Sequence, residues 1–336
     1  MQKILLTLIC TFASISSFSS AQEKVVSGNF AYLETQSQTV VAHNHPVYGG
    51  SLIEMGNHPN QQCASEFHFA FKGDPNTMRI WLSPSRHFDS SHGLAYEFEP
   101  TYCPGSLIPN SNLGYTSCVP SQAGQNTRDK GMHSLFGYGD PKAPVFGEKR
   151  YTGFAFYLPE NYFDDPFSPV MIWQQWQGSP HTPPVAAFLS TNANNGDIEL
   201  NISVSNDMTG ANPSAIRKET LYSPVKIEKG VWHRFIIMVI PRHSNMSQDG
   251  EVRIWKYDDE TTNATTQVGR WFGPIGYDPT GTYGGSHPNS SFDVTFGIYR
   301  DMQHRFHRIV FDSIRSATTY SAAQVLPTQQ LFCNNN

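Results

Sequence analysis

The stretch FDVTFGIYRDMQHRFHRIVFDSIR, from Phe292 to Arg315, decides the fold expected for this chain. In its first part, apolar and polar or small residues alternate: one side carries Phe292, Val294, Phe296 and Ile298, and the other carries Asp293, Thr295, Gly297 and Tyr299. A period of two is typical of a strand with one buried face and one exposed face. A short turn and a second strand-like run ending in FDSIR follow, so the stretch predicts a β-hairpin.

Similar short runs recur roughly every 10 to 20 residues, separated by turn-forming residues, and no long amphipathic helix is evident. They are Phe30–Leu33, Phe67–Phe71, Met78–Leu82, Gly93–Glu99, Gly153–Leu158, Val170–Gln177, Val185–Ser190, Asp197–Ser205, Trp232–Ile240 and Glu251–Tyr257. Residues 101–149 are rich in Gly, Pro, Asn and Ser and are predicted to be loops. The pattern predicts an all-β fold, an antiparallel β-sandwich or jelly roll of the concanavalin-like kind.

The N-terminus has the features of a secretory signal peptide. Lys3 precedes the apolar run Ile4–Phe18, and Ser19, Ser20 and Ala21 supply small residues for cleavage. We therefore expect residues 1–21 to be removed and residues 22–336 to form a single secreted, extracellular domain. The apolar run is short for a bilayer span, so we expect no membrane anchor.

Four cysteines remain once Cys10 leaves with the signal peptide: Cys63, Cys103, Cys118 and Cys333. Three pairings are possible in an oxidising compartment. We favour Cys103–Cys118, which closes a short loop, and Cys63–Cys333, which ties down the C-terminal tail. The acceptor sequences at Asn201, Asn245, Asn263 and Asn289 permit glycosylation.

Composition limits the partners. The net charge of −5 provides no general attraction for polyanions, so we expect no nucleic acid partner, and any acidic ligand needs a local basic cluster. His304 and His307 form an isolated HxxH pair with no obvious further ligands. We expect no metal, no cofactor and a monomeric protein.

Two groups of residues suggest chemistry. Gln175 and Gln177 share one face of an expected strand, with His181 just beyond it, and carboxamides can hold a carboxylate or hydroxyls. The alternative is the polar face of an ordinary strand. Tyr299 is a proton donor that needs nearby cations to act as a base. The nearest cations in sequence are Arg300, Arg305, His307 and Arg308.

Successive strand residues face opposite ways, so Tyr299 and Arg300 should share a face only if the strand ends there. A tyrosine at the sheet rim with solvated arginines is the alternative for this pair. His133, in the segment GMHSLFGYG, is a further candidate for a cleft. Asp197 and Glu199 are a weak match to the paired carboxylates of sandwich-fold glycosidases.

Six segments, in order over residues 150–321, resemble the polysaccharide lyase superfamily that includes bacterial heparin lyase and fungal glucuronan lyase. They are Tyr151–Pro159 (YTGFAFYLP), Trp173–Gly178 (WQQWQG), Gly230–Ile240 (GVWHRFIIMVI), Glu251–Lys256 (EVRIWK), Phe296–Arg300 (FGIYR) and Phe311–Arg315 (FDSIR). The resemblance implies a jelly roll with a cleft across its concave sheet. It also implies β-elimination at a uronic acid residue. The lack of a broad basic surface favours alginate or glucuronan over heparin-like substrates.

Carried over by position, the resemblance places Gln175, Tyr299 and Arg300 in the cleft, with Tyr299 as base and acid. The family's cleft histidine falls on Gln177 and a frequent lysine falls on Thr295, so Tyr299 performs both proton transfers or His181 or His133 substitutes. Arg305 and His307 are expected at the cleft edge, where they contact substrate. The rival functions are a non-catalytic carbohydrate-binding protein and a sandwich-fold glycoside hydrolase.

Overall fold

The computed structural model describes residues 143–162, 169–178, 182–192, 194–207, 216–282, 287–301 and 307–325, together with shorter segments of the N-terminal part. Those segments are 26–27, 43–45, 50–52, 70–71, 78–83, 93–98, 106–110, 115–119, 122 and 128–135. Every regular element assigned in these residues is a strand. None of them forms a helix long and apolar enough to cross a bilayer.

The first of two large sheets has eight strands among the described residues, in the order β17-β16-β15-β10-β19-β6-β5, with β1 also paired to β19. Their bounds are β17 (Thr265–Gly273), β16 (Gly250–Tyr257), β15 (Trp232–Ile240), β10 (Arg150–Tyr157), β19 (His307–Ala317), β6 (Gly93–Phe98), β5 (Met78–Ser83) and β1 (Val26–Ser27).

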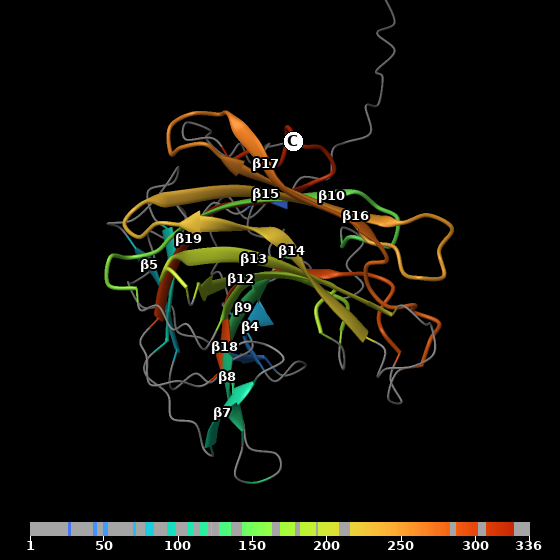
Figure 1. Cartoon of the computed structure of the whole chain (residues 1–336), viewed down its shortest axis with the longest axis horizontal. Coiled ribbons are helices and arrows are strands. Elements are labelled where there is room, and N and C mark those ends of the chain that lie inside the picture. The colour runs from blue at the N-terminus through green and yellow to red at the C-terminus, as the bar shows by residue number, and fades with distance from the viewer. Residues whose placement is uncertain are drawn as a thin grey trace, which may run out of the picture.

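The second large sheet has six described strands in the order β14-β13-β12-β11-β18-β9. They are β14 (Ile216–Ile227), β13 (Ile198–Asp207), β12 (Val185–Thr191), β11 (Val170–Trp176), β18 (Asp293–Asp301) and β9 (Arg128–Ser134). Figure 1 shows the two sheets as layers, with β15, β16 and β17 above β12 and β13. The strand pairs within both sheets are antiparallel, which confirms the predicted sandwich.

Two small sheets complete the described strands. One contains β2 (His43–His45), β3 (Gly50–Leu52) and β4 (Ala70–Phe71), and the other is the ribbon of β7 (Ser106–Asn110) and β8 (Tyr115–Val119). The β7–β8 ribbon projects at the bottom of Figure 1, away from the first large sheet.

The predicted hairpin of Phe292–Arg315 is wrong, because β18 and β19 belong to different sheets. The other errors in the strand predictions lie mostly at sheet edges. Residues 101–149 were predicted as loops, but they contain β7, β8 and β9, and neither β14 nor β17 was predicted. In the two large sheets, β9, β14 and β17 are all outermost strands. An edge strand is exposed along one side and carries polar and charged residues, so its sequence lacks the apolar alternation of an inner strand.

Some predictions fall outside the described residues. These include the signal peptide, the run Phe30–Leu33, and Cys63, Cys103 and Cys333. Cys118 lies in β8, of which only the backbone is described. The two disulfide pairings therefore stay predictions.

One apolar core fills the space between the sheets. Side chains from β10, β15 and β19 of the first sheet meet side chains from β11, β12, β13 and β18 of the second. Phe296 of β18 is 1% exposed, and its ring centroid lies 5.7 Å from that of Phe311 of β19. Burying one such side chain contributes about 1.5–3 kcal/mol to folding. The inward residues of β18 therefore hold this strand against the opposite sheet.

The C-terminal segment packs on the outer face of the first sheet. At Gly153 of β10, an added Cβ would lie 1.9 Å from the carbonyl oxygen of Ala323, so only glycine permits this approach. The segment is fixed further by Arg234, which donates to the carbonyl oxygen of Val325 (2.8 Å). The Val325 N–H in turn donates to the hydroxyl of Tyr257 (2.9 Å).

The Phe296 contact gives a stability prediction. Replacing Phe296 by alanine should lower the free energy of unfolding by about 3–5 kcal/mol, because it leaves a cavity between the sheets. Urea unfolding followed by circular dichroism measures this. Phe272 is the control, since it is 51% exposed and its replacement by alanine should cost less than about 1 kcal/mol. Equal losses would contradict the assignment of Phe296 to the core.

Candidate active site

The two faces of β18 have different roles. Val294, Phe296 and Ile298 enter the core between the sheets. Asp293, Thr295, Gly297 and Tyr299 alternate with them and so lie on the outer face of the second sheet, hereafter the site face. The alternation predicted from the sequence is confirmed, and Tyr299 is half-buried.

A β-bulge in β11 decides which of its glutamines reach the site face. The register of β11 with both neighbouring strands shifts between Met171 and Trp173, so Ile172 and Trp173 both enter the core. After the shift, Gln174 pairs with Thr295 on one side and Ala186 on the other. Gln174 therefore lies on the site face, and by alternation Trp176 does too.

The bulge corrects the prediction for Gln175. Its partners are Val294 of β18 and Val185 of β12, and both of these side chains belong to the core. Gln175 is 2% exposed and points to the inner side of the sheet. The resemblance had placed Gln175 in the cleft by position, and the bulge puts Gln174 there instead.

Gln177 has a structural role that does not fit the predicted contact with substrate. Its Nε2 donates to the carbonyl oxygens of Tyr277 (2.6 Å) and Asn289 (2.8 Å), and its Oε1 accepts from the N–H of Tyr277 (2.8 Å). The side chain is fully buried. Gln177 thus ties two distant loop segments to the end of β11.

Arg300 and His307 also lie inside the sandwich, which does not fit their predicted contact with substrate. Arg300 is 2% and His307 is 1% exposed, and a guanidinium nitrogen of Arg300 donates to Nδ1 of His307 (2.9 Å). Because arginine only donates, His307 accepts at Nδ1. The His307 ring also stacks on Tyr162, with centroids 5.2 Å apart. Tyr299 and Arg300 face opposite ways, as the sequence predicted.

Tyr299 lies at an apolar part of the site face. It packs with Phe188 against a small cluster of Met132, Met171 and Ala186. Two residues before it in β18 is Gly297, whose φ of 141° favours glycine and which pairs with Met132 of that cluster.

The centre of the site face is polar. Thr295 is buried there, and its hydroxyl approaches the sulfur of Met132 (3.8 Å). Gln174, paired with Thr295, is 2% exposed, yet its Nε2 has no hydrogen-bond partner among the residues that the structure describes. A buried amide left unpaired costs about 1–3 kcal/mol. The Nε2 of Gln175 is also unpaired, so the position on the site face, opposite Thr295, is what makes Gln174 the candidate donor to a ligand.

Sequence reasoning missed Gln174. Its neighbours in WQQWQ are also glutamines, and the choice among them depends on the bulge. Trp176, paired with Asp293, was missed for the same reason. The only available signal was the run of amides and indoles itself.

Further polar groups lie toward β13. Asn201 donates to the hydroxyl of Ser190 (2.7 Å), and Asn192 donates to a carboxylate oxygen of Glu199 (2.7 Å). The carboxylate of Asp197 pairs with Lys226 (3.0 Å). Asp197 and Glu199 are thus engaged in separate local contacts, which leaves the glycosidase interpretation of this pair without support.

The predicted histidines are only partly placed. His133 lies in β9 and pairs with Phe296, but its side chain is not described. His181 and Arg305 lie outside the described residues. In the same register, Lys130 is directly opposite Tyr299. No cluster of three or more His, Cys, Asp or Glu that could hold a metal occurs in the described part of the chain.

Comparison with known proteins agrees with the fold. The sequence profile of a family described as polysaccharide lyase matches residues 88–315. No curated protein matches the chain at a significant level. Among solved structures, an endo-β-1,4-glucuronan lyase from the fungus Trichoderma reesei is 18% identical, with a TM-score of 0.51 over 78% of this chain and 94% of its own.

Two alginate lyases are also similar in structure. The exolytic enzyme from Zobellia galactanivorans is 6% identical, with a TM-score of 0.44 over 78% of this chain and 98% of its own. The enzyme from Klebsiella pneumoniae is 7% identical, with a TM-score of 0.38 over 72% of this chain and 85% of its own.

The contacts of Gln177 and Gln174 predict that replacing the first lowers the stability of the protein much more than replacing the second. Gln177→Leu should lower the free energy of unfolding by at least about 1–3 kcal/mol, because it leaves buried groups of Tyr277 and Asn289 unpaired. Gln174→Leu removes an amide that is already unpaired and should cost little or nothing. Thermal unfolding of both variants measures the difference. A loss at Gln174 as large as that at Gln177 would contradict this placement.

Proposed function

The chain belongs to the polysaccharide lyase family, and we propose that it is a secreted enzyme that cleaves a uronic-acid polymer, alginate or glucuronan, by β-elimination at the site face. One observation carries the proposal: a half-buried tyrosine and a buried, unpaired amide lie on the same face of the second sheet. The secretory signal peptide expected at residues 1–21 supports the extracellular location.

The reaction needs three groups. Removing the C5 proton of a uronate creates negative charge next to a carboxylate that is already negative. A donor that neutralises the carboxylate stabilises this enolate-like transition state. A base then takes the C5 proton, and an acid protonates O4 as the C4–O4 bond breaks and the C4–C5 double bond forms.

We assign neutralisation of the carboxylate to Gln174. Its Nε2 is a donor without a partner in the structure, and it is held in a buried position where hydrogen bonds to a charged group are strong. Thr295, its neighbour on the site face, adds a hydroxyl. This pair takes the role that the sequence analysis expected of Gln175 and Gln177 with a histidine.

We assign both proton transfers to Tyr299. Thr295 and Tyr299 are four residues apart along β18, about 13 Å at 3.3 Å per residue. Gly297 lies between them in the same row of the site face, and we place the sugar ring between the Gln174 amide and the Tyr299 phenol. Tyrosine acts as base and then as acid when the proton and the leaving oxygen lie on the same sugar face.

Lys130 and the histidines are secondary candidates. A tyrosine base needs a cation to stabilise its phenolate, and Lys130 is the register partner of Tyr299. His181 stays a candidate from the sequence for a second donor to the carboxylate, whereas His133 pairs with the core residue Phe296 and so has a register position on the inner side.

The proposal predicts an unsaturated product. Purified protein incubated with polyglucuronate, alginate and heparin should produce the ultraviolet absorbance of a C4–C5 double bond on at least one uronate polymer. We expect glucuronan or alginate to respond before heparin. Tyr299→Phe should lower the rate by about 10²–10⁴-fold, because the variant cannot exchange a proton. Tyr157→Phe, in β10 of the opposite sheet, is the matched control and should stay active.

Two results would contradict this proposal. Reducing ends without the double bond would indicate hydrolysis, and retention of polymer without any product would indicate a binding protein. Full activity of Tyr299→Phe would overturn the assignment of the base.

The placement of the glutamines gives a separate prediction. Gln174→Leu should lower kcat by about 10²–10³-fold, the effect of removing one preorganised donor from the transition state. Gln175→Leu should retain most activity, because its side chain lies on the inner side of the sheet. Steady-state rates on the responsive polymer measure both. The reverse order of effects would indicate that the bulge is misplaced.

A further inference from the structure

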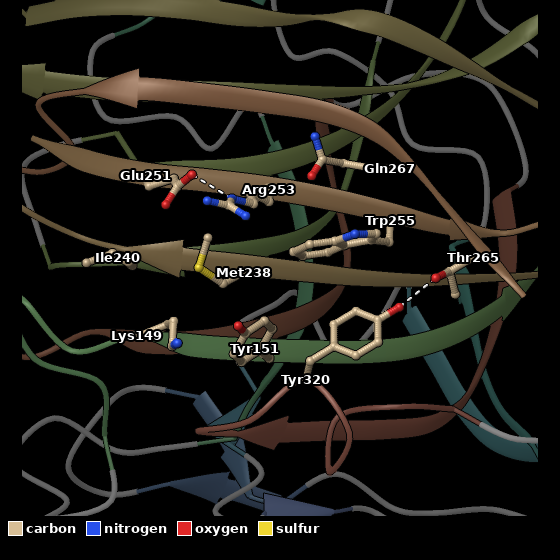
Figure 2. A pocket seen from close by; sticks show the side chains of 10 residues that line it. All are labelled: Lys149, Tyr151, Met238, Ile240, Glu251, Arg253, Trp255, Thr265, Gln267 and Tyr320. Carbon is tan, nitrogen blue, oxygen red and sulfur yellow. Dashed lines mark hydrogen bonds and ion pairs between the residues drawn. The ribbon is translucent and has the colours of Figure 1, made fainter. Parts of the chain in front are cut away.

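A second hollow lies on the outer face of the first sheet. It has a volume of about 690 Å³ and is lined by ten residues, shown in Figure 2: Lys149, Tyr151, Met238, Ile240, Glu251, Arg253, Trp255, Thr265, Gln267 and Tyr320. We call it the outer groove. It plays no part in the proposed chemistry, since the core separates its sheet from the site face.

The strand register shows that the groove crosses four strands. Tyr151 of β10 pairs with Met238 of β15, Met238 pairs with Arg253 of β16, and Arg253 pairs with Arg270 of β17. The adjacent row, Ile237 and Ile254, points into the core. Three strand spacings of about 4.8 Å give a groove about 14 Å long. This length suits a segment of an extended polymer better than a single small molecule.

One end of the groove is a corner of three aromatic rings. Tyr320 lies 5.2 Å from Trp255 and 6.0 Å from Tyr151, and Trp255 lies 6.3 Å from Tyr151, all between ring centroids. The hydroxyls of Tyr320 and Thr265 are 2.6 Å apart, which fixes Tyr320 over the sheet (Figure 2). All three rings are only partly buried. Fixed, half-exposed aromatic faces offer apolar surface for the C–H faces of sugar rings.

The remainder of the groove is positively charged. The carboxylate of Glu251 accepts from Nε of Arg253 (2.6 Å) and Nε of Arg270 (3.1 Å). Burial opposes ionisation of Glu251, but these two hydrogen bonds prevail and hold the pKa of the carboxyl below its usual value. Lys149 adds a third cation, 5.7 Å above the Tyr151 ring.

Two cations of the lining, Arg253 and Lys149, and the adjacent Arg270 thus accompany one carboxylate, in a chain whose net charge is −5. Within the described residues, Arg253 and Arg270 donate hydrogen bonds only through their Nε atoms. The terminal nitrogens of each guanidinium can therefore donate two parallel hydrogen bonds to a carboxylate of a ligand. The cations are therefore placed for an acidic ligand, although the protein as a whole repels one.

We propose that the outer groove is a second, non-catalytic binding site for acidic polysaccharide, in which aromatic rings stack on sugars and the cations hold uronate carboxylates. This proposal rests on the proposed function for the identity of the polymer. A site on the opposite face of the sandwich keeps the enzyme attached to a polymer while the site face acts on another stretch of it.

Affinity electrophoresis through gels containing polyglucuronate or alginate tests the proposal. All proteins carry Tyr299→Phe, so that the polymer stays intact. Adding Arg253→Gln or Trp255→Ala should weaken retention about tenfold or more, as expected for a charged or aromatic anchor. Arg242→Gln, a cation elsewhere on the surface, is the control and should leave retention unchanged.

The same groove substitutions in the active protein provide the second measurement. They should leave turnover of short uronate oligosaccharides unchanged, because these engage only the site face. Lys149→Gln, at an exposed position, serves as a third variant if Trp255→Ala unfolds in a thermal scan. Unchanged retention in all groove variants, or equal weakening by Arg242→Gln, would overturn the proposal.

The two proposals fail in distinguishable ways. If the protein forms no unsaturated product but its retention depends on Arg253 and Trp255, the lyase assignment is rejected and the proposed binding site in the outer groove is supported. If the protein cleaves the polymer and its retention does not depend on these residues, only the proposed binding site in the outer groove is rejected. Loss of oligosaccharide turnover in well-folded groove variants would show that the groove is part of the active site, and would overturn its separate role.

Discussion

The β-bulge in β11 is the constraint on which the candidate active site depends. The alternation of a strand has a period of two, so a single extra residue exchanges the faces of everything that follows. In β11 the bulge sends both Ile172 and Trp173 into the core, and it brings Gln174 to the face occupied by Tyr299. An apolar residue added to the core thus determines which polar residue is available for chemistry.

Buried polar contacts hold the surroundings of this face in place. The Gln177 side chain ties backbone groups of Tyr277 and Asn289 to the end of β11, and Arg300 joins the two sheets through His307. A buried polar group that loses its partner is costly, so such contacts favour one arrangement of the chain. These residues resemble site residues in sequence because both roles use amides, arginines and histidines. Only their burial and partners distinguish the two roles.

The sequence predicted the inner strands of the two large sheets well, but of the four strands that end their orders it predicted only β5. An inner strand such as β18 buries alternate side chains, so the alternation of apolar residues in its sequence predicts the strand directly. The edge strands β9, β14 and β17 have one open side and tolerate polar residues, so their sequences lack this alternation. The same limit applies to the site: the outward face of Tyr299 follows from alternation alone, whereas choosing between Gln174 and Gln175 requires the bulge, which no local pattern in WQQWQ reveals.

A sandwich has two outer faces that its core keeps apart. The site face belongs to the second sheet, and the outer groove belongs to the first, with the cluster around Phe296 and Phe311 between them. The two faces differ in chemistry as well: the described centre of the site face presents a phenol and an unpaired amide, while the groove presents rings and an excess of positive charge. Reaction at a uronate requires charge neutralisation at one atom at one moment, which favours a directed amide. Retention of a long polyanion requires only sustained attraction along its length, which fixed cations provide.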